Sequence, residues 1–62
     1  SYLPNKEDFT KAYRALAAQY GEEISIAEVL DEIEREAEKK EKKLKQNWRA
    51  ITEYNIEIWQ KG

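Results

Sequence analysis

The stretch from Ile26 to Trp59 constrains this chain most, because its 34 residues contain neither glycine nor proline. Glycine and proline are the strongest local terminators of regular structure. We therefore predict that most or all of this stretch forms one long helix. A break near residues 40–47 would instead let a third helix fold back, and residues 54–58 also alternate between apolar and polar side chains as a strand does. Both are kept as alternatives to the continuous helix.

A shorter helix is predicted before this stretch, over about residues 6–20. Asn5 is a favourable N-cap residue, and Gly21 stands where a left-handed residue ends a helix at the lowest cost. The apolar residues between them recur at i, i+3, i+4, i+7 and i+11, a spacing that places them on one face of a helix. These residues are Phe9, Ala12, Tyr13, Leu16 and Tyr20.

The second helix is expected to begin at Ile26. Ser25 is its N-cap and Glu28 lies at position N3, which together make a capping box. Ile24 and Val29 flank the same turn as a hydrophobic staple. A connection of only four residues, 22–25, favours an antiparallel helical hairpin. We expect its core to contain Phe9, Tyr13, Leu16, Tyr20, Ile26, Leu30 and Ile33.

The unequal lengths of the two predicted helices leave apolar surface uncovered. A helix over residues 6–20 spans roughly 23 Å, so it covers the second helix only to about residue 40. Residues 38–43 are all charged, with acid-before-lysine pairs four residues apart that support an exposed helix. Beyond them a partial heptad seam of a coiled coil resumes, interrupted by Lys40 and Asn47. The residues predicted to form an interface are Leu44, Trp48, Ile51, Tyr54, Ile58 and Trp59.

A chain of 62 residues makes a single small domain and buries only about 60% of its unfolded surface. Chains of this size usually need a disulfide, a metal or oligomerisation for stability. The sequence has no Cys and no His, which leaves oligomerisation. We therefore expect residues 1–62 to form an all-α helical hairpin completed by oligomerisation, with a three-helix bundle as the alternative.

The charge is unevenly distributed along the chain. Residues 22–38 contain eight acids and one base, a net charge of −7, whereas residues 39–49 contain six bases and one acid, a net charge of +5. On one continuous helix, this split favours an antiparallel copy of the same helix as the neighbour. An isologous homodimer is also the commonest kind of oligomer. A larger protein partner is the alternative occupant.

The composition argues against an enzyme. Without Cys or His the chain has no thiol nucleophile and no imidazole base, and no metal site or cofactor is expected. No apolar run reaches the length of a membrane span. No secretion signal is visible, so a soluble, cytoplasmic location is the default expectation. The chain starts at Ser1 and contains no Met, which also suits a fragment of a longer protein.

Nucleic-acid binding is the second functional hypothesis. Ala17, Gly21 and the following helix resemble the core of a helix-turn-helix motif, but acidic residues fill the helix that would face phosphates. The basic block at 39–49, with Trp48 available for stacking, is the credible contact; its residues are Lys39, Lys40, Lys42, Lys43, Lys45 and Arg49. The sequence thus favours a non-enzymatic interaction or assembly module, with a small nucleic-acid-binding regulator as the alternative.

Overall fold

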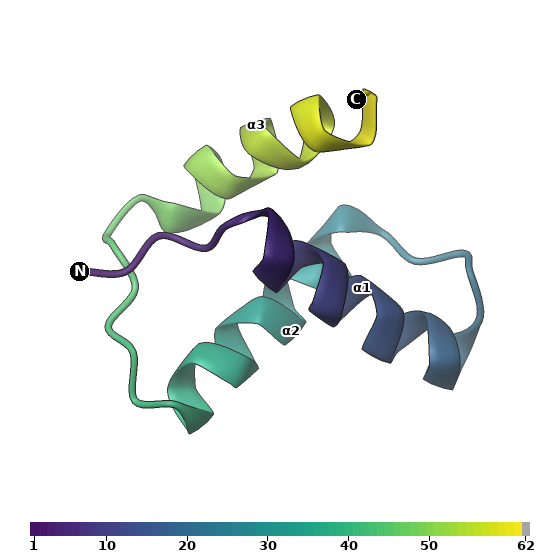
Figure 1. Cartoon of the computed structure of the whole chain (residues 1–62), viewed down its shortest axis with the longest axis horizontal. Helices are drawn as coiled ribbons and strands as arrows, with labels where there is room; N and C mark the ends of the chain where they lie inside the picture. The colour runs from purple at the N-terminus through teal and green to yellow at the C-terminus, as the bar shows by residue number, and fades with distance from the viewer. Residues whose placement is uncertain (62) are drawn as a thin grey trace.

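The computed structural model describes residues 1–61, which form three helices: α1 (Lys6–Tyr20), α2 (Ile26–Lys39) and α3 (Trp48–Lys61). The all-α class is confirmed, and the arrangement in Figure 1 fits the three-helix alternative. The predicted single helix over 26–59 is wrong, because the chain leaves the helix at residue 40 and α3 folds back. The side-by-side hairpin is not confirmed, since the axes of α1 and α2 diverge in Figure 1.

Both helix starts follow their capping residues, as predicted. The Asn5 side chain accepts a hydrogen bond from the Asp8 amide at 2.9 Å, and the Asp8 carboxylate accepts one from the Asn5 amide at 3.0 Å. Ser25 and Glu28 make the same reciprocal pair at the start of α2. Gly21 ends α1 with a φ of 90°, and its amide donates to the Ala17 carbonyl. These boundaries are predictable because each depends on residues within one turn.

The end of α2 depends on a residue that rarely takes this role. Glu41 has a φ of 56°, in the left-handed region. Its amide donates to the Glu38 carbonyl at 3.0 Å, and the Lys42 amide donates to the Ala37 carbonyl at 2.9 Å. These two bonds form a Schellman motif, which usually has glycine at the position of Glu41. The left-handed conformation costs a non-glycine residue roughly 1–2 kcal/mol, so contacts elsewhere must maintain the stop.

The N-terminal residues supply part of that support. The Tyr2 amide donates to the Lys43 carbonyl at 2.6 Å, and the Lys45 amide donates to the Tyr2 carbonyl at 2.9 Å. This isolated parallel bridge between Tyr2 and Leu44 fixes the connector against residues 1–5, which run beside it in Figure 1.

The fold-back of α3 completes the hydrophobic core. Trp48, Thr52 and Ile56 recur every four residues on the inner face of α3 and are buried. The Trp59 ring packs on Phe9 of α1 with 6.0 Å between ring centroids. Burying a large apolar side chain contributes about 1.5–3 kcal/mol, so these residues together outweigh the strain at Glu41.

The predicted core residues are mostly found in or against this core. Leu16, Leu30 and Ile33 are buried, and three more of the predicted set, Phe9, Tyr13 and Ile26, pack against the buried cluster. The exception is Tyr20, which is 65% exposed at the end of α1, so its placement in the core was wrong. Trp48 and Ile56 of α3 complete this core, where the predicted two-helix hairpin would have needed residues of a partner chain.

Candidate functional site

The six residues predicted as an interface divide between the core and the surface. Trp48 is buried, and Leu44 and Trp59 are partly buried against the same hydrophobic cluster. Tyr54 is 65% exposed, Ile58 is 51% exposed, and Ile51 is half-buried. The last three recur at i, i+3 and i+7 on α3, so they lie along one face. We refer to Ile51, Tyr54 and Ile58 as the outer stripe of α3.

The outer stripe exists because α3 carries two apolar faces. The inner face, which includes Trp48, Thr52 and Ile56, is used by the core, and the outer stripe lies beside it rather than within it. A surface helix typically has one apolar stripe toward the core and polar residues opposite. Folding of this chain thus leaves Tyr54 and Ile58 on the second apolar face of α3 exposed.

The acidic and basic segments found in the sequence form ion pairs with each other within the chain. The Arg49 guanidinium, at the start of α3, lies 3.0 Å from the Asp31 carboxylate and 3.3 Å from that of Glu34, both on α2. It also lies 5.4 Å from the Trp48 ring centroid. Because these pairs are exposed, each contributes at most about 1 kcal/mol, and they orient α3 on α2 more than they hold it there. The charge split thus gives no support to an antiparallel dimer, because that prediction required one continuous helix.

The predicted nucleic-acid contacts lie at the end of α2, on the connector and at the start of α3. Lys39 pairs with Glu36 at 3.4 Å, and Arg49 is engaged by the two carboxylates of α2. The Lys42 ammonium lies 4.2 Å from the centre of the Tyr2 ring. Lys40 and Lys42 also line a pocket, while Lys43 and Lys45 are exposed on the connector. The basic block therefore does not act as one continuous helix face.

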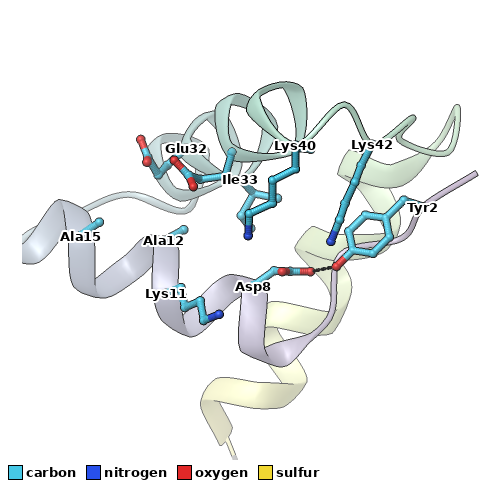
Figure 2. A pocket seen from close by; sticks show the side chains of 11 residues that line it. Tyr2, Asp8, Lys11, Ala12, Ala15, Glu32, Ile33, Lys40 and Lys42 are labelled. Carbon is cyan, nitrogen blue, oxygen red and sulfur yellow. Dashed lines mark hydrogen bonds between the residues drawn. The ribbon is translucent and has the colours of Figure 1, made fainter.

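A pocket of about 170 Å³ lies between α1 and α2 and was not anticipated from the sequence (Figure 2). Its lining includes three small side chains, of which Ala12 on α1 and Ala37 on α2 are buried and Ala15 on α1 is exposed. From the sequence, Ala12 belongs to the apolar face of the first helix, and that pattern gives no sign of a hollow between the two helices. The residues lining it are Tyr2, Asp8, Lys11, Ala12, Ala15, Glu32, Ile33, Glu36, Ala37, Lys40 and Lys42.

One end of the pocket is organised by a hydrogen bond between Tyr2 and Asp8. The Tyr2 hydroxyl donates to the Asp8 carboxylate, which also accepts the amide of Asn5 (Figure 2). The hydrogen bond to Asp8, with smaller contributions from burial and from the Asp8 and Glu7 charges, raises the pKa of Tyr2 to about 12. Asp8 thus caps α1 and anchors the N-terminal residues at once.

Other kinds of site are not found in the described part of the chain. Residues 1–61 contain no group of three potential metal ligands, and no helix among them is long and apolar enough to cross a membrane. Comparison with protein-family models, with curated proteins and with solved structures gave no match to this chain.

Proposed function

We propose that this chain is a non-enzymatic association module that binds a second copy of itself through the outer stripe of α3. The observation that supports this proposal is the exposure of Tyr54 and Ile58 at helical spacing, with Ile51 beside them. Tyrosine is among the residues that contribute most binding energy when a partner buries them, so Tyr54 is the main contact expected.

The distribution of charge favours α3 over α2 as the face between two identical chains. α3 carries two bases and two acids, a net charge of zero, whereas α2 carries six acids and two bases, a net charge of −4. Two α2 helices would repel each other, because like charges disfavour close approach. Two α3 helices meet without net repulsion and can bury their outer stripes against each other.

The size of the stripe predicts weak association. A stable interface buries about 800 Å² on each partner, which is roughly one sixth of the 4689 Å² of accessible surface on this chain. Three residues, one of them half-buried, supply only part of that area. We therefore expect a dimer that forms at high protein concentration and dissociates on dilution.

Sedimentation equilibrium tests the proposal, over concentrations from tens of micromolar to about 1 mM. The wild-type mass should rise with concentration, and Tyr54→Glu should keep the chain monomeric throughout. Tyr20→Glu is the matched control, because Tyr20 is also 65% exposed but lies on α1. A wild-type chain that stays monomeric at the highest concentration, or equal effects of the two substitutions, would overturn the proposal.

The assay also separates self-association from nucleic-acid binding. Association through apolar side chains should change little as salt is raised, whereas binding to phosphates weakens steeply with salt. A mass increase that requires added oligonucleotide and disappears at high salt would assign the basic residues, rather than the outer stripe, to the function.

A further inference from the structure

The pocket between α1 and α2 combines an apolar floor with cationic groups on its rim. The floor consists of Ala12, Ala15, Ile33 and Ala37. In Figure 2 the side chains of Lys40 and Lys42, which follow the end of α2, point across the pocket toward Asp8 of α1. Such a combination of an apolar surface and a few convergent polar groups is typical of small-molecule sites.

The carboxylates around the pocket already have partners. Glu32 pairs with Arg35 at 2.8 Å, and Glu36 pairs with Lys39 at 3.4 Å. Asp8 accepts hydrogen bonds from the Tyr2 hydroxyl and the Asn5 amide.

Two of the three lysines on the rim, unlike Glu32 and Glu36, have no ion-pair partner among the described residues. Lys11 pairs with Glu7 at 3.7 Å, but within residues 1–61 no carboxylate pairs with Lys40 or Lys42. The Tyr2 ring, 4.2 Å from the Lys42 ammonium, holds that group at the mouth of the pocket by a cation–π contact. The partners of Asp8 are neutral, so its negative charge remains beside those of Lys40 and Lys42. The charge left over around the pocket is therefore two positive against one negative, a net charge of +1, and it favours an anionic ligand.

The volume sets the size of the apolar part of that ligand. A cavity of about 150 Å³ lined by apolar residues binds benzene, so about 170 Å³ holds one ring. Sites for larger ligands run from about 300 Å³ upward, so a ligand here makes few contacts and binds weakly.

We propose that this pocket binds a small monocarboxylate whose apolar part is the size of one aromatic ring. The ring lies on the alanine floor, and the carboxylate lies between Lys40 and Lys42. Asp8 opposes the anion from the α1 side, and its hydrogen bonds from Tyr2 and Asn5 reduce this repulsion. No residue of α3 lines the pocket, so ligand binding is independent of self-association through the outer stripe.

Titration with phenylacetate, followed by the amide resonances of the labelled protein, tests the ligand class. Saturable shifts are expected around Ala12, Ala15 and Ala37, at millimolar ligand. Phenylacetamide is the neutral control of nearly identical shape, and it should bind roughly fivefold or more weakly because it gains no charge interaction with the lysines. Equal binding of the two compounds, or no localised shifts with phenylacetate, would overturn the proposal.

Two pairs of variants test the geometry of the site. Lys42→Gln should weaken phenylacetate binding roughly two- to fivefold, and the neighbouring Lys43→Gln should not, because Lys43 does not line the pocket. Ala15→Leu should fill the pocket and abolish binding, whereas Ala18→Leu adds the same side chain to another exposed position of α1. Leucine is a good helix former, so both variants should retain full helicity. Equal effects within either pair would contradict the assigned site.

Discussion

Thr52 carries an unsatisfied hydroxyl inside the core, and replacing it by valine should stabilise the protein. Thr52 is fully buried, and its Oγ1 atom has no hydrogen-bond partner among the described residues. An unsatisfied buried polar group costs about 1–3 kcal/mol. Valine has nearly the same shape and a similar helix propensity, so Thr52→Val removes this cost without creating a cavity or straining the helix.

The expected gain is about 1–2 kcal/mol in the free energy of unfolding, counted from the low end of that range. In a domain of this size each kcal/mol raises Tm by about 4–8 °C. Urea denaturation followed by circular dichroism measures the gain directly. The midpoint should increase while the slope stays constant, because the surface exposed on unfolding does not change.

Thr10 provides the matched control on α1. Its hydroxyl donates to the Lys6 carbonyl at 3.0 Å, so it is already satisfied. Thr10→Val should therefore leave stability within about 0.5 kcal/mol of the wild type. A neutral or destabilising Thr52→Val would refute the reasoning, because it would mean that the hydroxyl has a partner and that this part of the core is not closed.

Three further perturbations test the connections between the elements. Glu41→Gly should stabilise the protein by about 1 kcal/mol in urea denaturation, because glycine adopts the left-handed conformation without the penalty that glutamate has; unchanged stability would contradict the Schellman stop. Arg49→Gln should cost less than about 1 kcal/mol, since the ion pairs to α2 are exposed; a larger loss would show that they hold α3 in place. Tyr2→Phe tests the raised pKa of Tyr2: the neutral hydroxyl contributes stability that is present below pH 10 and lost as the pH rises toward about 12. The wild type should thus lose stability relative to Tyr2→Phe across that range, and parallel pH profiles of the two proteins would refute the assignment.

Local signals in the sequence predicted where helices begin. Asn5 with Asp8 and Ser25 with Glu28 form both capping boxes within a single turn each, so no distant contact was needed to locate Lys6 and Ile26. The all-α class follows from the same residues and from the spacing of the apolar side chains.

The end of α2 could not be predicted in this way. A left-handed Glu41 has no sequence signature, because glycine or asparagine is the residue normally read as a stop. The chain turns there because Trp48, Ile56 and Trp59 gain more from burial on α1 and α2 than the turn costs. That balance depends on contacts between residues far apart in the sequence, which the charged run at 38–43 gave no reason to expect.

The candidate sites, like the helix boundaries, could be predicted from the sequence only in part. The sequence identified apolar residues after position 43 that one short helix cannot cover, and Tyr54 and Ile58 are indeed exposed. It could not separate them from Trp48, which lies in the same segment but on the inner face of α3. The pocket was missed because alanine is uninformative until the facing helix is known.

We expect α3 to pack on its own chain and to leave the outer stripe to a second copy. Isotope-filtered nuclear Overhauser spectra of a mixture of labelled and unlabelled protein test both parts at once. We expect contacts between the rings of Phe9 and Trp59 only within one chain, and contacts of Tyr54 and Ile58 between chains. Phe9–Trp59 contacts between chains would contradict the account, because a continuous helix over 26–59 would donate its last third to a partner.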